Sequence, residues 1–538
     1  GGDVFGDAVN IASRIYPIAG PEGICVSQQV YDQVQNKFDL PILSLGEKTL
    51  KNVSRPVQVY SVQMPWEQPA SREATPYPAN RVAILPFTSF SSNPDDAYFA
   101  DGMTEEVIST ISGISGLEVV SRTSVMGYKG TTKKVKEIGR ELEVGSVLEG
   151  SFRKAGDKIR VTTQLIDVAR DRHLWAQNYD KNLDDIFEVQ SDVAKQVADA
   201  LRVRILSPER ERIEKKPTES TSAYTLYLKG MHYFNLRYMH SAGESKENVK
   251  TALRFFEQAV AEDPRFALGY VGQAGCHDVL GHTYDVEREA NLKRYEELIT
   301  KALELDPELA EAHASRGLHL DSFEDAEREL KKAIELKPSY AVAHGWYFQW
   351  LLAKSKWEEA LAQIDKALQL DPLSPQLNVW HAWFYEDRRD YGRALELYKR
   401  AIELGVTGGH AVVAEIYGRM KMFDDMKREF AAWVELEQGS WSFARTYADF
   451  YTAYYENDRQ TCRRLLPELE AHFGKEMGPD ASQVARAYFC VGDNDKGFEW
   501  LERSYSRKEG GDITHWPELD GLRNDPRYLD LVKRLDLG

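Results

Sequence analysis

The sequence predicts a multidomain protein that joins α/β domains to an all-α region. At 538 residues the chain is too long for a single hydrophobic core. Residues 63–80, which contain four prolines, and the charged residues 207–220 lack apolar periodicity and are typical of linkers. These linkers divide the chain into regions 1–62, 81–206 and 221–538, and the last region is helical and repetitive.

The net charge and the cysteine content limit which binding partners and which cellular compartment we expect for the protein. The net charge of −17 argues against a nucleic-acid backbone as the main partner. The sequence has no apolar run that approaches the ~20 residues needed to cross a bilayer, so it predicts no membrane span. The cysteines Cys25, Cys276, Cys462 and Cys490 form no CxxC pair. They indicate neither a zinc site nor a disulfide framework, and they are compatible with a reducing cytoplasm.

Region 221–538 repeats with a period near 34 residues. The phrases "AVAEDP", "KALELDP", "KAIELKP" and "KALQLDP" end at Pro264, Pro307, Pro338 and Pro372, so the spacings are 43, 31 and 34 residues. This period is that of a tetratricopeptide helix pair, in which proline stops the second helix. The 43-residue spacing predicts an extra helical segment or a long loop near residues 281–289. After Leu404 the repeats decay, and we expect an irregular helical cap.

A stack of such helix pairs exposes a concave groove, so we expect the repeats to bind a protein or peptide partner. Four tryptophans occur at helical positions in this region, namely Trp346, Trp350, Trp380 and Trp383. They are candidates either for that groove or for the core between the helices.

Region 81–206 mixes strands and helices. Residues 81–87 form a short apolar run that reads as a buried strand, and Thr104 is a candidate N-cap for the helix that follows. The turn "KAGDK" at 154–158 lies between two alternating runs and predicts a hairpin. The order of strand, helix, strand, helix, long hairpin and helix resembles the TolB amino-terminal domain. That resemblance implies a small α/β domain and no catalytic residues.

The stretch "GDVFGDAVNIASR" at residues 2–14 reads as a helix with Asp7 as its N-cap. Asn10 and Arg14 are four residues apart, so they share one helix face. An amide beside a guanidinium presents hydrogen-bond donors, for which a phosphate ester is a natural acceptor. The alternative is a solvated polar face. The stretch continues with a predicted strand over 23–27, a helix over 28–38, and a turn and terminal strand over 43–62.

Over residues 1–62 the sequence resembles the carboxy-terminal part of a class III nucleotidyl cyclase catalytic domain. The matching motifs are "DVFGD", "VNIASR", "GICVS", "LG", "LKN" and "PVQVY", in that order. The resemblance predicts part of a cyclase α/β sandwich.

The resemblance implies substrate-binding roles for Asp3 and Lys51 and catalytic roles for Asn10 and Arg14. Asp3 matches the residue that reads the purine, and an acidic residue there resembles adenylate rather than guanylate cyclases. Asn10 matches the amide that orients the ribose, and Arg14 the guanidinium that stabilises charge on the α-phosphate. Lys51 matches a lysine that binds the triphosphate, with Lys48 as an alternative for that role.

The implied reaction converts ATP to cyclic AMP and pyrophosphate, with Mg²⁺ or Mn²⁺ held by two aspartates. We expect those aspartates before Gly1, so that no metal ligand lies in this chain and the chain alone is inactive. In the parent, a homodimer through the cyclase domain would pair metal aspartates of one subunit with Asn10 and Arg14 of the other. We expect a cytoplasmic location, and a membrane anchor before Gly1 is compatible with it. The alternative is a non-catalytic tetratricopeptide scaffold with a degenerate cyclase remnant.

Overall fold

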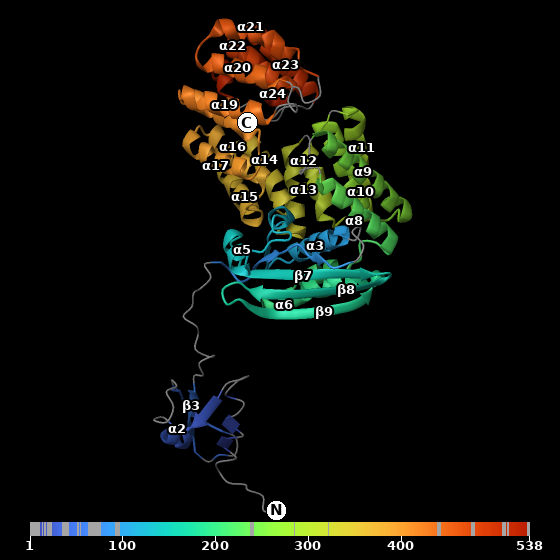
Figure 1. Cartoon of the computed structure of the whole chain (residues 1–538), viewed down its shortest axis with the longest axis vertical. Helices are drawn as coiled ribbons and strands as arrows, with labels where there is room; N and C mark the ends of the chain where they lie inside the picture. The colour runs from blue at the N-terminus through green and yellow to red at the C-terminus, as the bar shows by residue number, and fades with distance from the viewer. Residues whose placement is uncertain are drawn as a thin grey trace, which may run out of the picture. The chain divides into compact units, whose positions relative to one another are not determined.

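The computed structural model of the chain forms two compact units, Gly1–Pro76 and Tyr77–Gly538, which are treated separately here (Figure 1). The structure describes residues 11–12, 14–15, 18, 24–34, 42–50, 53, 55–62, 77–91, 97–236, 242–284, 286–320, 322–437, 443–474, 479–507, 513 and 516–534. No helix in this part of the chain is both long and apolar enough to cross a membrane.

The first unit contains a three-stranded antiparallel sheet and helix α2 (Gln28–Val34). Strand β3 (Val57–Val62) lies between β1 (Ile24–Ser27) and β2 (Ile42–Lys48). The turn predicted at the start of residues 43–62 is wrong, because that segment is strand β2. A bulge between Ser44 and Glu47 interrupts its pairing with β3, with Gly46 in the left-handed region at φ 77°. Glycine and a bulge within a strand give the same sequence pattern as a turn.

The second unit opens with a six-stranded sheet. Its strands are β4 (Arg81–Ile84), β5 (Thr88–Ser89), β6 (Glu118–Val119), β7 (Ser146–Ala155), β8 (Lys158–Asp167) and β9 (Arg172–Asn182), in the order β6-β4-β7-β8-β9, with β5 also paired to β7. All four residues of β4 are buried, as expected for a strand with a parallel neighbour on each side. The predicted hairpin is β7–β8, where Ala155 pairs with Lys158 around Gly156.

Helices α3 (Ala97–Ser112) and α6 (Ile186–Ala200) pack together beside this sheet. The prediction that Thr104 caps the helix is wrong, because α3 begins at Ala97 and Thr104 lies inside it. The Thr104 hydroxyl donates to the Ala100 carbonyl at 2.8 Å and accepts from the Phe87 backbone N–H at 2.9 Å. Thr104 therefore provides a hydrogen-bond acceptor for a buried backbone N–H in a loop, and not for the free N–H groups at a helix N-terminus. The need to pair this buried donor outweighs the local preference of threonine for capping.

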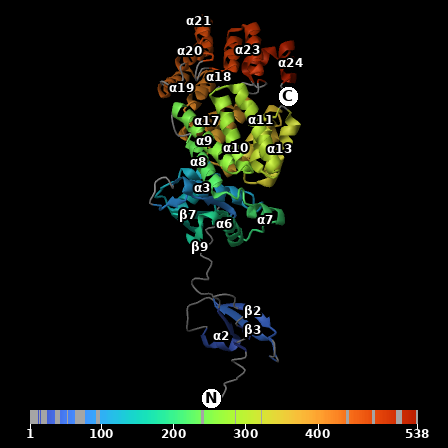
Figure 2. The same ribbon diagram turned by 90° about the vertical axis from the view of Figure 1, so that its right-hand side faces the viewer.

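Antiparallel helix pairs fill the rest of the second unit. The helices are α8 (Thr221–Leu236), α9 (Ala242–Glu262), α10 (Ala267–Asp278), α11 (Arg288–Leu305), α12 (Ala310–His319), α13 (Phe323–Leu336), α14 (Ala341–Ala353), α15 (Trp357–Leu370), α16 (Pro375–Asp387), α17 (Tyr391–Glu403), α18 (Gly409–Arg419), α19 (Phe423–Leu436), α20 (Ala444–Tyr455), α21 (Arg459–Glu470), α22 (Ala481–Val491) and α23 (Asn494–Ser506), followed by the 3₁₀ turn η5 (Pro517–Leu522) and α24 (Pro526–Arg534). Figures 1 and 2 show the pairs stacking away from the sheet toward the C-terminus.

Each repeat proline lies two residues beyond a second helix, at Pro264, Pro307, Pro338 and Pro372 after α9, α11, α13 and α15. Repeated alanines such as Ala326, Ala360 and Ala394 are fully buried where paired helices meet. This is a solenoid of the tetratricopeptide type. The predicted insertion lengthens one pair: α10 runs into a π turn, η3 (Val279–Thr283), and α11 has 18 residues where α13 and α15 have 14.

The chain differs from the sequence expectation at two further places, and it decides between the two positions that the sequence offered for the tryptophans. The charged residues expected as the second linker include helix α7 (Ser207–Glu214), which begins with Pro208 in its first turn. Beyond Leu404, where the repeats decay, α18 to α23 still form three consecutive pairs. Of the four tryptophans, Trp346, Trp350 and Trp380 pack against a core cluster, whereas Trp383 is 40% exposed.

The sheet domain docks on loops between the helix pairs. The Val119 N–H donates to the Ser339 hydroxyl at 3.1 Å in the loop after α13. In the loop after α15, Asp371 accepts a hydrogen bond from the Ser124 hydroxyl at 2.5 Å. At the end of α15 itself, the Gln369 carbonyl accepts from Arg81 at 2.5 Å. One hydrophobic cluster runs from β4 to the first helix pairs. The sheet and the early repeats therefore share one core.

Candidate functional site

The residues with cyclase-like motifs are only partly described by the structure. Asp3, Asn10 and Lys51 lie outside the described residues. Arg14 is exposed, and the next residue, Ile15, is buried with Leu50 and Val59 in the core of the first unit. Lys48 is exposed at the end of β2. An exposed arginine next to a buried isoleucine is the pattern of any amphipathic helix at a protein surface, so the role of Arg14 stays a prediction.

The metal ions implied by the cyclase resemblance find no ligand set among the described residues of the first unit. The carboxylates described there are Asp32 and Glu47, both exposed. Asp32 lies on α2, where it accepts a hydrogen bond from Gln28 at 2.8 Å, and Glu47 lies in strand β2. Neither carboxylate belongs to a cluster of metal-ligating side chains among the described residues.

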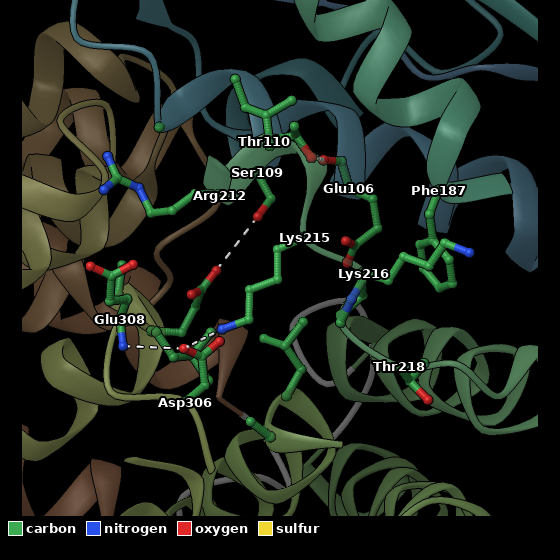
Figure 3. Close-up of a pocket in the computed structure, with 18 of the residues that line it drawn as sticks. Glu106, Ser109, Thr110, Phe187, Arg212, Lys215, Lys216, Thr218, Asp306 and Glu308 are labelled. Carbon is green, nitrogen blue, oxygen red and sulfur yellow. Dashed lines mark hydrogen bonds and ion pairs between the residues drawn. The ribbon is translucent and has the colours of Figure 1, made fainter. Parts of the chain in front are cut away.

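The second unit contains a cavity of about 940 Å³ at the junction of the sheet domain and the early repeats (Figure 3). It is lined by α3, α6, α7, the segment after α7, and the loops around the repeat prolines. The labelled residues in Figure 3 come from segments as far apart as Glu106 and Glu308. Most of its lining is polar or charged, so it is suited to a polar ligand rather than an apolar one.

Ion pairs inside the cavity order its charged side chains. Lys337 donates to the Ser109 hydroxyl at 2.8 Å and pairs with Glu311. Lys215 pairs with Asp306 at 2.7 Å, and the Asp306 carboxylate also accepts from the Glu308 N–H at 3.2 Å. Burial alone would raise the pKa of Glu311, but the charge of Lys337 and its hydrogen bond outweigh burial and lower that pKa.

Glu106 is the exception among these carboxylates. Burial raises its pKa to about 8, and the neighbouring charges of Glu105 and Glu311 also raise it, while Lys337 acts in the opposite direction. Glu106 is therefore neutral at pH 7 and can donate a hydrogen bond into the cavity. The cavity therefore offers both hydrogen-bond donors and hydrogen-bond acceptors to a polar ligand.

Replacing Glu106 with glutamine should flatten the pH dependence of stability. The native chain keeps a proton on Glu106 up to about pH 8, whereas the unfolded chain releases it near 4.5. The stability that Glu106 contributes is therefore fully present below pH 4.5 and is lost as the pH rises to about 8. We expect the unfolding temperature of the Glu106→Gln variant to fall less between pH 5 and pH 8.5 than that of the unmodified chain.

The exposed Glu308 lines the same cavity and provides a matched control. The Glu308→Gln variant should keep the pH slope of the unmodified chain. Equal slopes for all three proteins would show that Glu106 titrates normally.

Comparison with known proteins identifies relatives for parts of the chain. Residues 79–196 match the sequence model of the family described as "HilA/YgeH-like transcriptional regulator, second domain". The matched residues include the strands of the sheet domain, which the sequence analysis compares with the TolB amino-terminal domain. Because the matched family is described by a different name, the resemblance to TolB stays a prediction. The match covers less than a quarter of the chain.

One curated relative is named for an adenylate cyclase activity, and it aligns with less than half of this chain. The chain is 39% identical over 233 residues to "Putative adenylate cyclase 3" of Rhizobium meliloti (strain 1021), an alignment over 42% of this chain and 40% of the relative. It is also 22% identical over 286 residues to "DnaJ homolog subfamily C member 7" of Mus musculus, over 50% of this chain and 54% of that protein. The chain thus spans about half or less of the length of these relatives.

Among solved structures, the chain is similar to pilF of Pseudomonas aeruginosa, at 17% identity and a TM-score of 0.31, over 40% of this chain and 95% of that one. It is similar to yeast Tom70, at 14% identity and a TM-score of 0.32, over 65% of this chain and 82% of that one.

Proposed function

We propose that residues 1–62 form the donor half of an adenylate cyclase site and that the second unit is a regulatory module that binds protein or peptide partners. In this proposal Asp3 reads adenine, Asn10 orients the ribose, Arg14 stabilises charge on the α-phosphate and Lys51 or Lys48 holds the triphosphate. The metal half, with Mg²⁺ or Mn²⁺, comes from a second cyclase segment, so the chain alone forms no cyclic AMP.

The observation that carries this proposal is the 39% identity over 233 residues to the relative named "Putative adenylate cyclase 3". The set of four donor and recognition residues in motif order supports it, because a decayed site would have lost some of them. The exposed position of Arg14 beside the buried Ile15 is compatible with ligand contact.

The alternative function is a non-catalytic tetratricopeptide scaffold with a degenerate cyclase remnant. The paired helices of the second unit favour an interaction role in either case. What separates the two functions is whether Asn10 and Arg14 still support turnover.

A complementation assay tests the proposal with the full chain. The chain is mixed with a class III cyclase catalytic domain that keeps both metal aspartates but carries alanine at the positions equivalent to Asn10 and Arg14. We expect the mixture to form cyclic AMP from ATP and Mn²⁺, while neither protein does so alone.

The matched control is Arg55→Ala, which removes another exposed arginine of the same unit and should leave the complemented activity intact. Absence of cyclic AMP from a mixture in which the two proteins associate would favour the scaffold alternative.

A further inference from the structure

Three potential metal ligands meet beside the insertion in the second helix pair. Asp278 ends α10, His282 lies in the π turn η3, and His319 ends α12. One ligand atom from each side chain lies within 4.8 Å of the other two. The side chains are 22–29% exposed, so an ion from solvent can reach them.

The geometry places both imidazoles on one carboxylate oxygen. His282 Nδ1 lies 2.6 Å from Asp278 Oδ1, and His319 Nε2 lies 3.1 Å from the same atom. The two imidazole rings stack with centroids 5.0 Å apart. Although His319 Nε2 is buried, it forms no hydrogen bond of good geometry, so a buried polar atom at the centre of the cluster lacks a full partner.

The surrounding residues hold this arrangement in place. Tyr295 packs edge-on against the His319 ring at 4.5 Å and donates its hydroxyl to the Ser315 carbonyl at 2.5 Å. The Tyr284 N–H donates to the Val279 carbonyl at 3.3 Å, which closes the π turn, and the Val286 N–H donates to the Leu280 carbonyl at 3.0 Å. Single π turns inserted in helices are frequent at functional sites.

We propose that Asp278, His282 and His319 bind one divalent transition-metal ion of the zinc type. Bonds of about 2.0–2.2 Å from nitrogen and oxygen ligands place neighbouring ligand atoms about 3.3 Å apart in a tetrahedron. From Asp278 Oδ1 the observed separations are 2.6 Å to His282 Nδ1 and 3.1 Å to His319 Nε2, so ion binding requires the imidazole rings to move outward, that of His282 more than that of His319. A bound ion would also give His319 Nε2 a partner.

Three protein ligands leave one tetrahedral position open for water or for a group from a partner. The two imidazoles select against Mg²⁺ and Ca²⁺, which prefer all-oxygen ligands. This site would therefore be chemically distinct from a Mg²⁺ or Mn²⁺ site for ATP. Because Asp278 and His282 belong to one helix pair and His319 to the next, the ion would fix the angle between the two pairs.

Calorimetric titration of the full chain with Zn²⁺ tests this site. We expect one tight site per chain, and a visible absorption spectrum typical of tetrahedral Co²⁺ when Co²⁺ replaces Zn²⁺. Asp278→Asn and His319→Gln should each weaken binding by about 100-fold or more, since even outer residues of metal sites cost 10–100-fold. Millimolar Mg²⁺ should not compete.

The control variant is His410→Gln, because His410 also pairs with a carboxylate, Glu429, at 2.6 Å but outside the cluster. It should bind Zn²⁺ like the unmodified chain. As a second readout, Zn²⁺ should slow amide hydrogen exchange in residues 278–284. The proposal is overturned if no stoichiometric Zn²⁺ binding occurs, if both cluster variants bind Zn²⁺ normally, or if exchange in the π turn is unchanged.

Discussion

Replacing Arg14 with alanine should lower the turnover number for cyclic AMP by about 10²–10³-fold in the complemented enzyme, with little change in KM. The proposed role of the guanidinium is to stabilise the charge that develops on the α-phosphate in the transition state. Loss of such a donor removes stabilisation of the transition state and not of bound ATP. Asn10→Ala should have an effect of similar size, because the ribose hydroxyl must be held in line for attack. Initial rates over a range of ATP concentrations separate kcat from KM.

The Arg55→Ala chain provides the reference for these rates. A raised KM with unchanged kcat for Arg14→Ala would show that the arginine only binds substrate. Unchanged values for both constants would place Arg14 outside the site.

The second large effect concerns stability at the C-terminal end of the solenoid. Arg486 on α22 lies 2.5 Å from Glu415 on α18 and 2.9 Å from Glu518 on η5. The side chains of Glu415 and Glu518 are 6% and 3% exposed. Burial alone would raise the pKa of Glu518, but the charges of Arg486 and Arg419 lower it, so its carboxylate is ionised.

We expect Arg486→Met to destabilise these helix pairs by about 3–5 kcal/mol, because two buried carboxylates lose a shared cation. Arg419 remains nearby, but it also pairs with Glu386 at 2.9 Å. Amide hydrogen exchange in α22 measures the change locally and should accelerate by roughly 10²–10⁴-fold.

An exposed ion pair provides the control. Arg160 pairs with Asp180 at 2.6 Å, but both side chains are more than 60% exposed, so Arg160→Met should leave exchange in its strands unchanged. Adding Glu518→Gln to the Arg486→Met chain should restore part of the protection, since it removes one unpaired charge. Unchanged exchange in α22 of the single variant would show that the cluster does not stabilise the fold.

The sequence predicts the solenoid well because its signals are local. Proline lies two residues after the last residue of α9, α11, α13 and α15, and alanine marks where paired helices meet. The same local reasoning fails at Thr104 and Gly46. Thr104 has the properties of a helix cap, yet a tertiary hydrogen bond to Phe87 sets its role. Gly46 is typical of a turn, yet pairing with β3 makes its segment a strand with a bulge.

The candidate sites depend on contacts that no local pattern encodes. Glu106 and Lys337 share a cavity although more than two hundred residues separate them. Asp278 and His282 are four residues apart, and this spacing can be read directly from the sequence. His319 joins them only because α12 packs against α10, and this depends on the length of the insertion. The cyclase motif is different, because its residues can be recognised from their order in the sequence alone. That these residues come together in a cyclase site remains a prediction.

The central claim is that residues 1–62 supply the catalytic donors of an adenylate cyclase. The most direct test is the initial rate of cyclic AMP formation as the full chain is titrated into a fixed amount of the metal-half cyclase domain. We predict a rate that rises to saturation with the unmodified chain and with Arg55→Ala, and that falls by about 10²–10³-fold with Arg14→Ala. A rate that stays at the level of the metal-half domain alone, or that rises equally with the Arg14→Ala chain, would contradict the claim.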